Sequence, residues 1–179
     1  PQGCCILSKE FYETDLARGF VRGYNIQVTR GPGPATTART GLARGTIPWG
    51  AGHHEAFARA HDRTVNIGIC CEDLPEAHNT VTLDAQRSDA HGIPAAKITY
   101  RMSENTQRML QHGLDRGTEV MKAAGAVEVY TEGPMRMAGW HLLGTARMGT
   151  DPERSVVNEW GRSHDVKKLF IVDGSGFVT

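Results

Sequence analysis

The sequence lacks both a charge imbalance and a long apolar run. Lysine plus arginine number 20, and aspartate plus glutamate also number 20, so the formal net charge is zero. This balance provides neither a basic surface for nucleic acid nor a polybasic patch for an anionic membrane. No apolar stretch approaches the roughly 18 residues that indicate a membrane-spanning helix. We therefore expect a globular protein that binds no nucleic acid and has no membrane segment.

The chain also lacks the features of a secretory start. The opening residues Pro1-Gln-Gly-Cys-Cys contain no methionine, no basic segment and no apolar segment, so no signal peptide is predicted. Such a beginning is typical of the middle of a longer chain. It predicts a processed protein or one piece of a larger enzyme, with the cytoplasm as the favoured location.

Cysteine is scarce, and no Cys-x-x-Cys motif is present. The four cysteines form two adjacent pairs, Cys4-Cys5 and Cys70-Cys71. The histidine spacing near them matches no zinc site, so no metal is predicted. Free buried thiols are the simplest interpretation, and a disulfide within or between the pairs is the alternative. The second pair ends an apolar run that starts at Val65, which favours packing in the core.

Segments rich in β-branched and aromatic residues predict strands, with glycine and proline at the turns between them. The predicted strands span residues 20–29, 64–72, 80–84, 97–102, 127–130 and 168–173. We expect a short helix over 55–61, and a loop over 35–52 because that stretch has no clear periodicity. There is no repeat and no linker-like change of composition. Several strands followed by one long helix indicate an α+β fold, with a mostly antiparallel sheet and packed helices.

The clearest helix follows Ser103, a residue type suited to the N-cap. Apolar residues recur at helical spacing as far as Ala124, and Gly125 suits the position after the last turn. Gly113 and Gly117 each weaken this helix by up to about 1 kcal/mol. Their four-residue spacing predicts a helix face that packs closely against a neighbouring element.

His141 differs from the other seven histidines, which lie in polar or helical contexts typical of solvated or structural residues. Trp140 and two leucines flank it, and glycines bracket the group. A partly desolvated imidazole is disfavoured as the cation. The sequence therefore predicts that His141 is a neutral base near physiological pH.

Three sequence blocks then follow one another in a familiar order. They are His141-x-x-Gly-Thr-x-Arg-Met-Gly149, Asn158, and Leu169-Phe-Ile-Val-Asp-Gly-Ser175. Upstream, residues 79–100 resemble a substrate-domain strand pair. Together these blocks closely resemble the glucose–methanol–choline family of FAD-dependent oxidoreductases. Within that family, the residues of these blocks are most similar to those of sugar or gluconate dehydrogenase-like and pyranose oxidase-like members.

The resemblance implies FAD as the cofactor and an alcohol or sugar as the substrate. It implies that His141 accepts the hydroxyl proton of the substrate while hydride passes to the flavin N5 atom. Asp173 and Gly174 resemble a turn where the backbone approaches the flavin, although a turn that ends a core strand is the alternative. Thr145 and Arg147 are implied to orient groups near the cofactor or, alternatively, to stabilise their loop.

Gln27 and Thr29 are the candidate substrate-binding residues. They are two positions apart, so both project from one face of the predicted strand. The resemblance to pyranose oxidase-like enzymes implies that they contact substrate hydroxyls. An exposed polar sheet face with no ligand is the alternative interpretation.

Two elements of the family are absent from the sequence. No Gly-x-Gly-x-x-Gly fingerprint follows a strand, so the AMP end of FAD has no predicted binding site. The chain also ends at Thr179, before the position where related sequences place a His or Asn beside the catalytic histidine.

The resemblance therefore divides the chain into two parts. Residues 1–137 are the expected substrate-binding domain. Residues 138–179 are the expected catalytic motif and a portion of the FAD-binding domain, which the strand over 168–173 would join. The remaining FAD-binding portion is expected in the same longer chain or in a partner chain. Two alternatives stay open: a non-catalytic binding module, and a flavin enzyme with a different reaction type.

Overall fold

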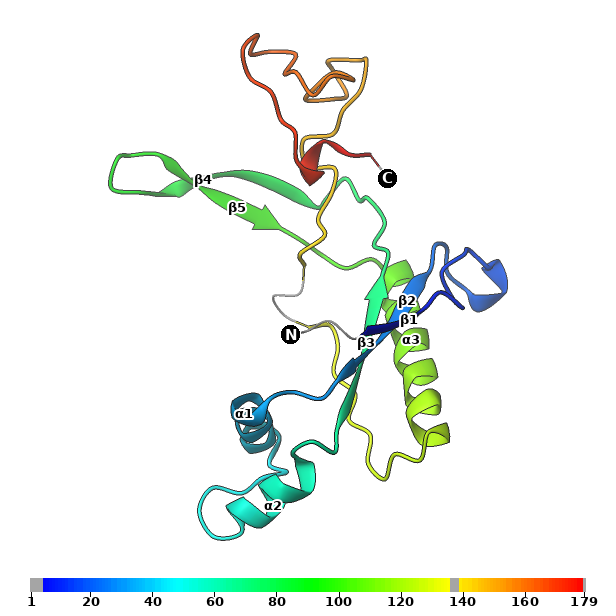
Figure 1. Ribbon diagram of the computed structural model, residues 1–179. Coiled ribbons are helices and arrows are strands. Elements are labelled where there is room, and N and C mark those ends of the chain that lie inside the picture. Colours follow the sequence, from blue (N-terminus) through cyan, green and yellow to red (C-terminus); the bar gives the residue numbers. More distant parts are fainter. Residues whose placement is uncertain (1–4, 136–138, 179) are drawn as a thin grey trace. The chain divides into compact units, whose positions relative to one another are not determined.

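The computed structural model describes residues 5–135 and 139–178 (Figure 1). Cys4, the predicted domain boundary between 137 and 138, and Thr179 lie outside the described residues. The chain forms two compact units. The first comprises Pro1–Glu72 with Glu104–Thr131, and the second comprises Asp73–Ser103 with Glu132–Thr179. The predicted α+β class with antiparallel strands is confirmed.

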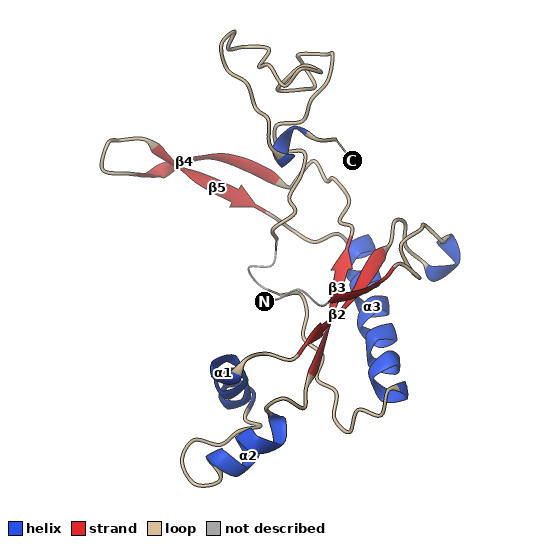
Figure 2. Cartoon of the chain, viewed as in Figure 1, coloured by secondary structure: helices blue, strands red, loops and turns tan. Residues whose placement is uncertain are grey.

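The first unit is built on a three-stranded antiparallel sheet in the order β1-β2-β3 (Figure 2). The strands are β1 (Cys5–Ser8), β2 (Tyr24–Arg30) and β3 (Val65–Cys71). The pairing of β2 with β3 runs without interruption, from Tyr24 opposite Cys71 to Arg30 opposite Val65. The loop before β2 contains a short 3-10 turn, η1 (Leu16–Arg18). Predicted strands 20–29 and 64–72 are thus confirmed, with β2 starting four residues later than expected.

Helix α3 (Glu104–Ala123) lies along one face of this sheet (Figure 2). Alternate side chains of β2 turn toward it, because successive residues of a strand point to opposite faces. The buried cluster contains Phe20, Tyr24, Ile26 and Met109, and half-buried side chains from β3 pack against it. The predicted close approach of the helix is confirmed at Gly113, where an added Cβ would overlap Ile69.

The segment between β2 and β3 contains two helices, α1 (Pro34–Arg44) and α2 (His53–Ala60). The short helix was expected, but the prediction of a loop over 35–52 was wrong for its first ten residues. Pro34 occupies the first turn, where its missing N–H is harmless, and Gly45 ends the helix at φ +71°. The helix closes on Ile47, which packs directly onto Gly41 and is buried. Tertiary packing therefore compensates for the weak periodicity.

In the second unit, β4 (Thr80–Ser88) and β5 (Pro94–Thr99) form an antiparallel hairpin. Most of the remainder is held by turns and isolated bridges, and a 3-10 turn, η2 (Gly174–Gly176), lies near its end. The predicted strand over 168–173 is not formed, and only Phe170 makes a bridge, to Arg162. The predicted strand over 127–130 is also absent. A strand needs a partner, and the described residues offer neither segment a continuous one.

No helix in the described ranges is long and apolar enough to cross a membrane. Cys5 and Cys70 are free thiols. Cys71 is half-buried against the core cluster, whereas Cys5 and Cys70 are exposed. The prediction that the second pair packs in the core is therefore confirmed for Cys71 and wrong for Cys70. The two side chains differ because neighbouring residues point to opposite faces of β3.

Candidate functional site

The histidine motif and the Asp-Gly segment lie side by side in the second unit. The Ala146 N–H donates to the Ser175 carbonyl at 2.9 Å, and the Met148 N–H donates to the Gly176 carbonyl at 2.8 Å. A Cβ at Gly174 would lie 3.2 Å from the Leu143 side chain, so glycine allows this close approach. Two blocks separated by about 30 residues in the sequence are thus joined into one structure.

A second loop, residues 154–157, forms hydrogen bonds with the other end of the histidine motif. The Gly149 N–H donates to the carbonyl of Val157, which is fully buried, and the Val156 N–H donates to the Arg147 carbonyl. Arg147 Nε donates to the Arg154 carbonyl at 2.7 Å. Of the two roles proposed for Arg147, these contacts support loop stabilisation.

Asn158, the middle block of the sequence pattern, shapes this loop rather than a site. Its Oδ1 accepts hydrogen bonds from the backbone N–H groups of Trp160 and Arg162, each at 3.0 Å. An asparagine that bonds backbone groups two and four residues on is a turn former.

His141 itself is exposed, and so are its neighbours Trp140 and Leu142, with exposed fractions of 76% and 71%. The expectation that these apolar neighbours enclose the imidazole is therefore wrong within the described chain. Thr145 is also exposed. The motif presents a basic ring and apolar side chains together on an open surface.

Asp173 lies at the start of η2, where hydrogen bonds favour the charged form of its carboxylate. Its Oδ1 accepts hydrogen bonds from the Ser175 hydroxyl at 2.6 Å and from the Ser175 N–H at 2.8 Å. Because both bonds favour the charged form, they lower the pKa of Asp173 below its ordinary value. Asp173 is thus an ionised acceptor beside Gly174.

Ser155 and His164 resemble the hydroxyl–imidazole pair of a hydrolase, but their contacts exclude that chemistry. His164 Nε2 lies 3.0 Å from Ser155 Oγ and 3.1 Å from the Gly149 carbonyl oxygen. A carbonyl can only accept, so Nε2 carries a hydrogen and cannot take a proton from the serine. Ser155 in turn donates to the Asp151 carbonyl. The pair therefore stabilises the loop.

Gln27 and Thr29 lie in the first unit, on the β2 face opposite α3. Ile26 and Val28, which alternate with them, pack toward the helix. Gln27 Nε2 donates to Asn25 Oδ1 at 3.0 Å, so the polar row extends one position further than the sequence reasoning named. The two-residue alternation that selected Gln27 and Thr29 also points to Asn25.

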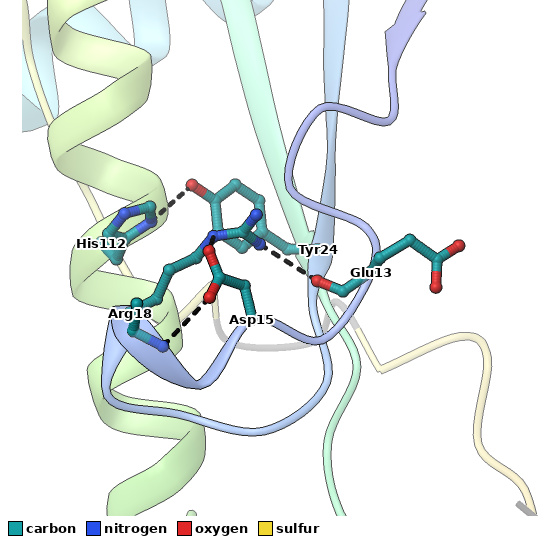
Figure 3. Close-up of polar contacts among 6 residues, drawn as sticks. Glu13, Asp15, Arg18, Tyr24 and His112 are labelled. Carbon is teal, nitrogen blue, oxygen red and sulfur yellow. Dashed lines mark hydrogen bonds and ion pairs between the residues drawn. The ribbon is translucent and has the colours of Figure 1, made fainter.

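Tyr24 and His112 form a polar pair inside the first unit (Figure 3). The Tyr24 hydroxyl and His112 Nδ1 are 2.8 Å apart, and Tyr24 is only 1% exposed. Phe11 and Phe20 contact the imidazole edge-on. Burial raises the pKa of Tyr24 to about 12 and lowers the pKa of His112. The pair joins β2 to α3, with the Tyr24 ring in the buried core cluster of the first unit.

Arg18 completes this cluster from the loop before β2 (Figure 3). It donates to the Glu13 carbonyl at 3.1 Å and pairs with Asp15 at 3.4 Å. Its guanidinium also lies over the Phe11 ring. Among the residues that the structure describes, no group of histidine, cysteine or carboxylate side chains is placed to hold a metal ion.

A family model described as GMC oxidoreductase matches residues 75–179. The chain therefore belongs to the GMC oxidoreductase family, and the resemblance read from the three sequence blocks is confirmed.

Several relatives with assigned activities resemble the chain beyond that region. The 2-methyl-1,2-propanediol dehydrogenase of Mycolicibacterium austroafricanum is 42% identical over 99% of this chain and 32% of its own length. The fructose dehydrogenase large subunit of Gluconobacter japonicus is 34% identical over 68% of this chain and 22% of its own length. The gluconate 2-dehydrogenase flavoprotein of Pantoea cypripedii is 26% identical over 89% of this chain and 27% of its own length. The chain spans about a third or less of each of these proteins.

Proposed function

We propose that this chain is part of an FAD-dependent oxidoreductase that oxidises a CH–OH group of a sugar or other alcohol. The observation that carries the proposal is the hydrogen-bonded pairing of the histidine motif with the Asp-Gly turn, in a chain of the GMC family. The names of the relatives support the reaction class, since they include a diol dehydrogenase, a sugar dehydrogenase and a sugar-acid dehydrogenase.

The proposed role of His141 is to accept the hydroxyl proton of the substrate. Oxidation of R₂CH–OH to R₂C=O releases one proton from oxygen and one hydride from carbon. A neutral imidazole has a lone pair for that proton, and its removal makes departure of the hydride easier. FAD, when bound, supplies the acceptor for this hydride at its N5 atom.

The residues beside His141 fit such a cofactor. Trp140 and Leu142 are exposed apolar side chains, suited to contact with a flat ring system. The ionised Asp173 suits the hydroxyl groups of a ribityl chain, because a carboxylate accepts hydrogen bonds and would repel a phosphate. Gly174 permits close approach of the backbone, and Thr145 offers an exposed hydroxyl nearby in the motif.

Gln27 and Thr29 are the proposed contacts to substrate hydroxyls. A glutamine amide offers both donors and an acceptor, and a threonine hydroxyl offers one of each, so both match the hydroxyl groups of a polyol. We further propose that residues 1–137 form the substrate-binding part and residues 138–179 the catalytic motif. The main FAD-binding portion would come from the same longer chain or from a partner chain.

The full-length protein that carries this sequence tests the proposal. We expect visible flavin absorbance in the purified protein, and oxidation of sugars or diols with an artificial electron acceptor. Full-length protein without flavin would instead favour a binding module. Bound flavin without oxidation of any alcohol would favour a different reaction on the same scaffold.

A further inference from the structure

Gly68 lies inside a strand, at a position where neither a bulge nor a positive φ angle requires glycine. It lies in the middle of β3, where the pairing with β2 has no bulge. Its backbone is not among those with positive φ. Glycine in a strand interior weakens the strand, because it loses more backbone freedom on folding and packs no side chain.

The described chain also leaves room for a side chain at this position. A Cβ at Gly68 would have only Gln27 Cβ and the Gln27 carbonyl oxygen nearby, each at 3.8 Å, which is ordinary contact. By contrast, a Cβ at Gly113 or Gly23 would overlap its neighbours. Interior strand glycines without a bulge or bend commonly mark a point where a ligand or another backbone comes close.

Gly68 faces the polar row of β2. It is the direct partner of Gln27 in the antiparallel register, so the two positions share the face opposite α3. Gln27 donates one amide hydrogen to Asn25. No hydrogen bond of its Oε1 or second N–H is seen among the residues described by the structure, and the side chain leaves β2 at the position directly opposite Gly68.

We infer that Gly68 is a specificity-determining residue, which leaves room opposite Gln27 for a hydroxylated carbon chain and limits its size. This inference rests on the proposed function and names the substrate class within it. Asn25, Gln27 and Thr29 carry uncharged amide or hydroxyl side chains, and so does Asn66, the β3 partner of Thr29. The row therefore suits a neutral polyol or sugar better than a carboxylate-bearing one.

The test uses Gly68→Ala and Gly68→Val in the full-length protein. The φ angle at Gly68 is not in the left-handed region and valine favours strands, so neither change strains the fold. The probes are neutral alcohols of rising size: 1,2-propanediol, 2-methyl-1,2-propanediol, D-fructose and D-glucose. We expect kcat/KM to fall in the order glycine, alanine, valine. The loss should come mainly from KM and be at least about tenfold greater for the largest accepted probe than for the smallest.

Gly33 provides the matched control. It also has open space around its missing Cβ and no positive φ, and it lies outside the sheet. Gly33→Ala and Gly33→Val should leave the size preference unchanged. Equal kcat/KM losses for all probes at Gly68, or none, would overturn the inference while leaving the proposed function intact.

Two other outcomes separate the remaining explanations. Loss of bound flavin or of thermal stability in Gly68→Val would mean that another polypeptide segment occupies this space, which contradicts a substrate role. Failure of the wild-type protein to oxidise any alcohol would overturn the proposed function and this inference with it.

Discussion

At the scale of single residues, the amide of Gln27 can bind a substrate hydroxyl selectively only if it is held in one orientation. The hydrogen bond from Gln27 Nε2 to Asn25 Oδ1 fixes which end of the amide faces the strand. Asn25 is therefore a positioning residue for the proposed substrate contact. Its effect should pass entirely through Gln27.

We expect Asn25→Ala in the full-length protein to raise KM for its alcohol about three- to tenfold, the equivalent of one hydrogen bond. Asn25→Asp keeps the acceptor oxygen and should restore most of the affinity. In a Gln27→Ala background, Asn25→Ala should have no further effect on KM. Additive losses in the double variant would show that Asn25 acts independently of Gln27.

The protonation of a second single residue, His112, links the stability of the fold to pH. Burial, with Arg116 and Arg18 nearby, lowers the pKa of His112 in the folded state. The unfolded chain therefore binds more protons near pH 6, so stability is present above the unfolded pKa of about 6.5 and is lost as pH falls below it.

His112→Asn offers an oxygen acceptor in place of Nδ1 without a titrating group. We expect the thermal midpoint of the full-length protein to fall less between pH 7.5 and 5.5 in this variant than in the wild type. Identical pH dependence in the two proteins would contradict a proton-linked role for His112.

At the scale of elements, the two glycines of α3 separate packing from propensity. A Cβ at Gly113 would overlap the Ile69 side chain and approach Tyr24 at 3.4 Å. A Cβ at Gly117 would meet Ile67 at 3.5 Å and Ile69 at 3.6 Å, which is ordinary contact. Substitution by alanine should therefore lower the free energy of unfolding at Gly113 but not at Gly117.

We expect Gly113→Ala to lower the free energy of unfolding by about 1–3 kcal/mol, because the helix must move away from β3. Gly117→Ala should be neutral or raise it by up to about 1 kcal/mol through helix propensity. Chemical denaturation of the two variants measures both values. Equal effects would mean that α3 does not approach the sheet as described.

The sequence predicted those elements whose signals are local. Periodicity and capping residues located α3, and β-branched residues located β2 and β3. Helix α1 was missed because its stability comes from Ile47 packing onto Gly41, a contact that periodicity does not reveal. The strand expected over 168–173 has an apolar sequence, but Leu169 and Val172 are exposed and the described chain supplies no continuous partner strand.

At the scale of the whole molecule, the chain is short beside its relatives and leaves many apolar side chains exposed. It covers 32% of the length of its diol dehydrogenase relative, and many of its apolar side chains near the end are exposed. The sequence blocks predicted the family, and the hydrogen bonds between residues 146–148 and 175–176 join two of them. The prediction that apolar neighbours enclose His141 was wrong within the described residues, because sequence adjacency does not make Trp140 and Leu142 fold over the ring.

His141 is proposed to remove the hydroxyl proton of the substrate as the hydride departs. The most direct measurement is the rate at which flavin absorbance bleaches when the full-length protein meets its alcohol without oxygen or another acceptor. We predict that His141→Ala slows this bleaching at least about 100-fold while the flavin spectrum before mixing stays unchanged. Equal bleaching rates in the wild type and the variant would contradict the account.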